Sequence, residues 1–279
     1  MKLQIILCIA LFFSITFLSI DSSAKAFEIP RTKVVKIQDS ATKRFYELYI
    51  QLPLEFVEGK KYPVVYMVDS LHTFPIISGS IQLPIMFHRM EDIMLVGISW
   101  ETKQKPFLSR QRDYTPSVTD PASQNLMGQA DKHLSFIRND VINYVEKNYT
   151  TDPEQRTFVG HSFGGLLGTY ILLTQPSTFK NYLLSSPSLW WDDKYILKLE
   201  NEIAKSISDI NANVYISDGA LESDLMHGPA KELTSLLESR KYKNLSLQLA
   251  VIEAANHETA FPTAAIRGLS WFYRIEVSN

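Results

Sequence analysis

Short, continuous apolar runs recur along the chain and constrain its fold more than any other feature. Residues 62–68 (YPVVYMV) and 93–98 (IMLVGI) are runs of this kind. Such runs are typical of strands buried on both faces, as in a mostly parallel sheet. Further strand-like stretches cover residues 45–51, 156–160, 182–185, 214–217 and 245–252.

Helical periods separate these strands. Between residues 129 and 149, Leu134, Ile137, Val141 and Val145 recur at steps of three and four and form one apolar stripe. Residues 165–173, 229–237 and 263–273 are also expected to be helical. This alternation predicts an α/β fold with a mostly parallel central sheet and helices on both faces.

Residues 104–125 form the longest stretch without periodicity, with three prolines, and we predict a long surface excursion there. Neither an internal repeat nor a linker divides the remainder of the chain. Residues 27–279 are therefore expected to form a single domain.

The N-terminus has the pattern of a secretory signal peptide. Lys2 precedes an apolar run over residues 3–20, and residues 24–26 (AKA) match a small-x-small cleavage site. We therefore predict a signal peptide over residues 1–26 and a periplasmic or secreted protein. An uncleaved membrane anchor is the alternative, because about 18 apolar residues approach the length of a membrane span. The single cysteine, Cys8, lies in this segment, so residues 27–279 contain no thiol nucleophile.

Composition argues against several classes of function. The formal net charge of −2 provides no basic surface for nucleic acid. Six histidines and one cysteine, without CxxC, HExxH or HxxxH spacing, argue against a metal site. No cofactor is implied by the sequence.

The most informative motif is G-x-S-x-G over residues 160–164, centred on Ser162. A strand over residues 156–159 precedes it and a helix over 165–173 follows it, which is the context of a nucleophile elbow. Glycines flank the serine where the tight turn leaves no room for a side chain. We predict that Ser162 is a nucleophile; a plain glycine-rich turn is the alternative.

A serine hydroxyl needs a base within hydrogen-bond reach to act as a nucleophile. Only His227 and His257 follow Ser162 in the chain. His257 comes after the strand over residues 245–252 and before the last helix, so we predict that it is the base. We expect His227 to be a solvated loop residue, and His161 to pack against a neighbouring loop.

The acid that orients the base is expected after the strand over residues 214–217. Glu222 is favoured because its longer side chain could reach His257. At this point the acid candidates are Glu222, Asp218 and Asp224, with Asp192 and Asp193 as more distant choices.

An oxyanion hole requires two backbone N–H groups. One is the amide of Phe163, directly after the nucleophile. The other is expected in the loop after the strand over residues 62–68, where Leu71 is the candidate. We expect Asp69 to tie this loop down by hydrogen bonds.

Five stretches of the chain together are similar to one known family: YPVVYMVDSLHTF, RDYTPS, GQADKHLSFIRNDVINYVEKNY, FVGHSFGGLLGTYILLTQPSTFKNYLLSSPSLWWDD and DGALES. With these stretches, the chain from about residue 30 to its C-terminus resembles the putative-esterase branch of the α/β hydrolases. That branch includes siderophore-trilactone esterases, S-formylglutathione hydrolase, feruloyl esterases and mycolyltransferases, and the first of these are the most similar. One departure is Asp69-Ser70, where many members have Asp-Gly.

Carried over residue by residue, the resemblance implies an α/β-hydrolase fold and ester cleavage. Ser162 would be the nucleophile, Glu222 the acid and His257 the base, with Leu71 and Phe163 as oxyanion donors. The expected partner is a small-molecule ester that forms an acyl-enzyme. An acyltransferase with the same acyl-enzyme, or a non-catalytic binding protein on this scaffold, is the alternative.

Three residues are candidates for substrate contact. Trp190 and Trp191 follow the strand over residues 182–185 and could wall the pocket; packing in the core is the alternative. Arg110, with Arg112 beside it, could meet an anionic or catecholate substrate. The alternative for both arginines is a solvated surface charge.

Overall fold

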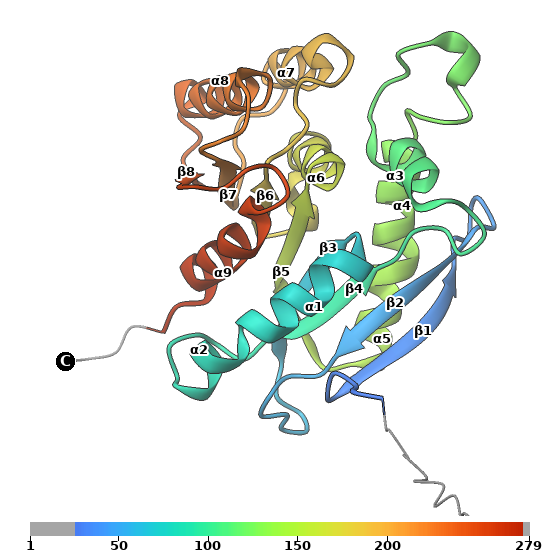
Figure 1. Cartoon of the computed structure of the whole chain (residues 1–279), viewed down its shortest axis with the longest axis vertical. Helices are drawn as coiled ribbons and strands as arrows, with labels where there is room; N and C mark the ends of the chain where they lie inside the picture. The colour runs from blue at the N-terminus through green and yellow to red at the C-terminus, as the bar shows by residue number, and fades with distance from the viewer. Residues whose placement is uncertain (1–25, 276–279) are drawn as a thin grey trace, which may run out of the picture.

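The computed structural model describes residues 26–275, and its centre is one eight-stranded sheet (Figure 1). The strand order is β1-β2-β4-β3-β5-β6-β7-β8. The bounds are β1 (Thr32–Gln38), β2 (Phe45–Gln51), β3 (Tyr62–Val68), β4 (Met94–Ile98), β5 (Thr151–His161), β6 (Asn181–Ser185), β7 (Ala212–Gly219) and β8 (Leu245–Ile252).

The sheet is mostly parallel, as predicted. β2 runs antiparallel to both β1 and β4, and every other neighbouring pair is parallel. The carboxyl ends of β3, β5, β6, β7 and β8 therefore meet at one edge, where open α/β sheets bind their ligands.

Helices cover both faces of the sheet, which confirms the predicted fold class. Figure 1 shows α1 and α9 side by side, and with α2 they pack on one face. The remaining helices pack on the other face. The bounds are α1 (Ser70–Ser80), α2 (Gln82–Met86), α3 (Pro106–Tyr114), α4 (Ala130–Phe136), α5 (Asn143–Asn148), α6 (Phe163–Thr174), α7 (Trp191–Ile203), α8 (Asp224–Arg240) and α9 (Ala260–Tyr273).

The two layers of helices explain why the central strands are continuous apolar runs. In β3, Val64, Tyr66 and Val68 point into the core beneath α6. Val65 and Met67 point into the core beneath α1 and α9. Because side chains alternate across a strand, burial of both faces requires an apolar residue at every position.

The predicted surface excursion over residues 104–125 contains a helix in its first half. This helix is α3 (Pro106–Tyr114), and its buried side chains include Arg112 and Asp113. Charged residues at buried positions hide the apolar periodicity by which a helix is recognised.

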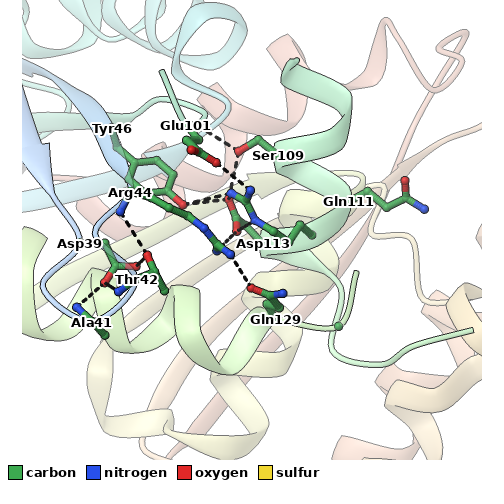
Figure 2. A network of polar contacts seen from close by, with 12 residues as sticks. Asp39, Ala41, Thr42, Arg44, Tyr46, Glu101, Ser109, Gln111, Asp113 and Gln129 are labelled. Atoms are coloured by element: carbon green, nitrogen blue, oxygen red, sulfur yellow. Dashed lines mark hydrogen bonds and ion pairs between the residues drawn. The ribbon is translucent and has the colours of Figure 1, made fainter. Parts of the chain in front are cut away.

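A network of hydrogen bonds and ion pairs connects α3 to β2 of the sheet (Figure 2). The carboxylate of Asp113 accepts hydrogen bonds from Arg112 Nε at 2.8 Å, Ser109 Oγ at 3.0 Å and the Tyr46 hydroxyl at 3.0 Å. Arg112 also forms an ion pair with Glu101 at 2.7 Å. Burial opposes ionisation of Asp113, yet nearby positive charge and the hydrogen bonds from Arg112 and Ser109 hold its pKa below the ordinary value. The network therefore contains a buried carboxylate that is fully satisfied.

We expect Asp113→Asn to destabilise the fold by about 3 kcal/mol at pH 7, because it leaves buried cationic and hydroxyl donors without a carboxylate. The folded-state pKa of Asp113 lies below its unfolded value, so this stabilisation is complete above about pH 4. It is lost as the pH falls through the folded pKa. Urea unfolding at several pH values measures the difference between wild type and variant.

The matched control is Asp193→Asn, which changes an exposed carboxylate paired with Lys198 and should leave stability unchanged. A difference between wild type and Asp113→Asn that stays constant from pH 7 to pH 3 would contradict the assignment of the effect to the charge of Asp113.

Candidate active site

Ser162 lies in a strained turn between β5 and α6. Its backbone has φ 59° and ψ −119°, in the region that non-glycine residues rarely adopt. The first hydrogen bond of α6 runs from the amide of Leu166 to the carbonyl of Ser162. The turn therefore places the side chain of Ser162 at the carboxyl edge of the sheet, directly before a helix N-terminus.

Two glycines make this turn possible. A Cβ atom at Gly160 would lie 2.1 Å from the carbonyl oxygen of Gly164, and a Cβ atom at Gly164 would lie 2.8 Å from Val68 Cγ2. Neither position can hold a side chain without displacing backbone or core. This agrees with the steric reason for glycine that the motif implies.

Glu222 and His257 form a hydrogen-bonded pair at the same edge. Glu222 follows β7 and His257 follows β8, and Glu222 Oε2 lies 2.8 Å from His257 Nδ1. Glu222 Oε1 accepts hydrogen bonds from Ser186 Oγ at 2.6 Å and from the amide of Gly219 at 2.7 Å. The Glu222 side chain is only 1% exposed.

These contacts determine the charge of Glu222 and the tautomer of His257. Burial opposes ionisation, but the hydrogen bonds from Ser186, Gly219 and His257 bring the pKa of Glu222 below its usual value. An ionised carboxylate only accepts, so Nδ1 of His257 must donate. In the neutral imidazole, Nε2 is then free to accept a proton.

Ser162 and His257 line one pocket of about 530 Å³. Its walls include Trp100, Phe107 and Phe261. Within the pocket region, the hydroxyl oxygen of Ser162 lies 3.2 Å from Ser188 Oγ. The pocket therefore brings together a strained serine and a histidine oriented by a carboxylate.

His161 packs against the loop that carries His257. The two ring centroids are 4.6 Å apart, and His161 Nδ1 lies 3.3 Å from Ser185 Oγ. Burial, together with the neighbouring His257, lowers the pKa of His161 to about 3. His161 is therefore a neutral ring beside His257 at physiological pH.

The structure pairs the alternative acid and the alternative base with each other. His227 lies in α8, and its Nδ1 is 2.5 Å from Asp218 Oδ2. The expectation that His227 is a solvated loop residue was wrong, because Asp218 at the end of β7 binds it. Asp224 is exposed at the start of α8. Among these acid candidates, Glu222 is the one that contacts His257.

The amides of Phe163 and Leu71 both lie at helix N-termini. Phe163 is the first residue of α6, and Leu71 lies in the first turn of α1. The amides of His72 and Thr73 bond to the carbonyl of Asp69, so Leu71 precedes the first helical hydrogen bonds of α1. Amides at such positions have no acceptor within the helix and are available to an anion.

Asp69 ties down the loop before α1, as expected. Its Oδ1 accepts hydrogen bonds from Trp100 Nε1 at 2.6 Å and from Arg110 Nε at 2.8 Å. Asp69 itself has φ 59°, so this loop is held in a conformation that needs such support.

The candidates for substrate contact differ in whether they line the pocket. Arg110 lines the pocket, whereas Trp190 and Trp191 pack against Phe163 and lie outside the pocket lining. Trp191 is buried, with its ring edge-on to Phe163 at 5.4 Å. The solvated alternative was wrong for both arginines: Arg110 pairs with Asp69, and Arg112 is buried in the Asp113 network.

Ser186 and Ser188 contact the candidate acid and the candidate nucleophile, and the sequence reasoning did not single them out. The only sequence signal was their place in SSPS directly after a predicted strand. Which hydroxyl meets which partner depends on how the loops after β6 and β7 fold together.

Comparisons with known proteins agree with the fold. The family model described as "Putative esterase" matches residues 40–272. Ferri-bacillibactin esterase BesA of Bacillus subtilis is 27% identical over 265 residues, covering 88% of this chain and 91% of that protein. The siderophore triacetylfusarinine C esterase of Aspergillus fumigatus is 30% identical over 195 residues, covering 67% of this chain and 66% of that protein.

Among solved structures, the BES protein from Bacillus cereus superimposes with a TM-score of 0.81 at 25% identity, covering 90% of this chain and 98% of that one. The family match and the structural superposition therefore both cover most of the chain. The protein belongs to the putative esterase family and is a carboxylic-ester hydrolase.

Proposed function

We propose that Ser162, His257 and Glu222 act as a catalytic triad that cleaves esters through an acyl-enzyme. The observation that carries this proposal is the Glu222–His257 hydrogen bond in the pocket that holds the strained Ser162. Ser162 Oγ attacks the ester carbonyl while Nε2 of His257 takes the hydroxyl proton. His257 then gives this proton to the leaving alcohol. Water, activated by the same imidazole, releases the acid.

In the structure without substrate, the Ser162 hydroxyl is not yet placed for the attack. The hydroxyl of Ser162 lies beside Ser188, and we propose that it turns toward His257 by rotation about its Cα–Cβ bond when substrate binds. Hydrogen bonds between catalytic groups are often long or misaligned in an unliganded enzyme and tighten when substrate binds. The amides of Phe163 and Leu71 would receive the developing oxyanion, supported by the N-terminal ends of α6 and α1.

We propose siderophore-type esters as the substrate class, in keeping with the names of the relatives described above. The pocket suits bulky aryl groups because Trp100, Phe107 and Phe261 form its walls. Arg110 adds a positive charge: burial opposes it, but the carboxylate of Asp69 more than compensates and raises the pKa of Arg110. An anionic or catecholate oxygen near Arg110 would therefore be favoured over a plain alkyl chain.

We also propose that the protein is exported and acts in the periplasm or outside the cell. The predicted signal peptide, residues 1–26, lies outside the described residues except for its last position. Residues 27–279 would form the one mature domain. The helices described over residues 26–275 include none of the length and apolarity needed to cross a membrane.

Ser162→Ala is expected to lower turnover of a p-nitrophenyl ester by about 10³-fold or more, because it removes the attacking oxygen. A fluorophosphonate probe should label wild type at Ser162 and leave the variant unlabelled, as read by mass spectrometry. Full turnover by a folded Ser162→Ala protein would disprove the proposed nucleophile.

The two histidines after Ser162 provide a matched pair of substitutions. His257→Gln should lower kcat by about 10³-fold, because the base is lost. His227→Gln should keep at least a third of wild-type kcat, because His227 binds Asp218 and lies outside the pocket lining. Steady-state rates with one ester measure both; equal losses in the two variants would reject the choice of His257.

Substrate preference is tested with three ester classes: cyclic siderophore triesters, aryl esters and short acyl esters. We expect kcat/KM for the siderophore triester to exceed that for the short acyl ester by at least about tenfold, since only the former fills the aromatic walls and meets Arg110. Including an alcohol acceptor and analysing the products separates hydrolysis from acyl transfer. A transesterified main product would favour the acyltransferase.

A further inference from the structure

Residues 185–188 (SSPS), which end β6 and form the turn after it, contact two members of the proposed triad, Glu222 and Ser162. Ser186 Oγ donates to Glu222 Oε1 at 2.6 Å, and Ser188 Oγ lies 3.2 Å from Ser162 Oγ. The backbone of the turn also holds the elbow, because the amide of Ser162 bonds to the carbonyl of Ser185 at 3.0 Å. Among these contacts, that of Ser186 has the clearest consequence.

Ser186 is held in a costly conformation. Its φ is 41°, in the left-handed region that favours glycine, and the residue is completely buried. Its amide donates to the carbonyl of Ser217 in β7 at 2.6 Å, which keeps the backbone in place. A glycine would adopt this backbone with less strain. The serine side chain is therefore retained at a position where backbone preference alone would favour its loss.

The contact of the Ser186 hydroxyl with Glu222 gives the serine side chain a function at this position. The two oxygens of Glu222 have different neighbours: Oε2 meets His257, and Oε1 meets Ser186 and the amide of Gly219. One donor from the turn after β6 and one from the end of β7 fix the plane of the carboxylate and turn Oε2 toward Nδ1 of His257. Because the Glu222 side chain is only 1% exposed, water has little access to replace a lost donor.

We propose that Ser186 is a positioning residue that orients Glu222 and keeps it ionised, so that His257 is presented to Ser162 in the correct tautomer. This inference rests on the proposed triad and assigns a role within it. Ser186 acts through Glu222 and does not touch the reacting atoms.

Loss of the hydroxyl should lower kcat about 10-fold to 100-fold and leave KM nearly unchanged. A hydrogen bond to a buried charge contributes roughly this factor, and it supports the imidazolium that forms only during the reaction. The acidic limb of kcat/KM against pH should move to higher pH. The hydrogen bond from Ser186 is one cause of the lowered pKa of Glu222, so without the hydroxyl this pKa rises and a higher pH is needed to ionise the carboxylate.

Three substitutions separate the hydroxyl from the backbone. Ser186→Gly removes the hydroxyl and relieves the strain, whereas Ser186→Ala removes the hydroxyl and keeps the strain. Ser186→Cys is close in shape and keeps a weak donor, so we expect it to have intermediate activity. Both Ser186→Gly and Ser186→Ala should lose activity equally, while Ser186→Gly should melt at a higher temperature than Ser186→Ala because it lacks the backbone strain.

The matched control is Ser217→Ala. Ser217 is completely buried beside the same turn, and within the described structure its hydroxyl has no hydrogen-bond partner. Its removal should leave kcat and the pH profile unchanged. This control separates the loss of a buried hydroxyl in general from the loss of the one that contacts Glu222.

Two results would overturn the inference. One is a folded Ser186→Gly protein with wild-type kcat and an unmoved pH profile. The other is recovery by Ser186→Gly of the activity that Ser186→Ala loses, which would assign the effect to backbone strain. Measuring Ser162→Ala and probe labelling in parallel keeps the two proposals separate: an active Ser162→Ala protein refutes the triad, whereas an inactive one beside an unaffected Ser186→Gly refutes only the role of Ser186.

Discussion

The site depends on the close approach of β5 and α6 at the turn that carries Ser162. The hydrogen of Gly160 faces the carbonyl of Gly164 where a Cβ atom would lie at 2.1 Å, and Ser162 has a positive φ between them. This geometry exposes the serine side chain at the sheet edge and places the first amides of α6 behind it. A strained residue persists only where its surroundings determine its conformation, and here the sheet register and the neighbouring turn after β6 do so.

Because β5, β6, β7 and β8 are parallel neighbours, residues that are far apart in the sequence meet at one site. The loop after each strand opens at the same edge, so each contributes one group: Ser162 after β5, Ser186 after β6, Glu222 after β7 and His257 after β8. The opposite wall comes from α3, whose Arg110 reaches the pocket while Asp113 holds the helix from behind. The proposed triad and the pocket wall with Arg110 are thus supported by different parts of the fold.

Where sequence reasoning failed, the cause was a polar group whose burial and partner depend on tertiary packing. His227 has the surroundings of a loop residue in the sequence, yet Asp218 binds it nine residues earlier, across the turn that carries Glu222. α3 was missed because Arg112 and Asp113 are buried as an ion pair, which interrupts the apolar stripe of a helix. The same explanation holds for the serines after β6, since the sequence does not show which acceptor a serine hydroxyl will contact.

The sequence by itself determined the elbow, the order of the candidate groups and every described strand except the exposed edge strand β1, because these depend on local properties. Burial on both faces demands unbroken apolar runs, and a tight turn demands glycine, whatever lies elsewhere in the chain. Only the tertiary structure decided which carboxylate meets which histidine, that Trp190 and Trp191 lie outside the pocket lining, and that Ser186 contacts Glu222. Those outcomes depend on how loops from separate strands pack against one another, and a difference of a few ångströms there is not encoded in spacing along the chain.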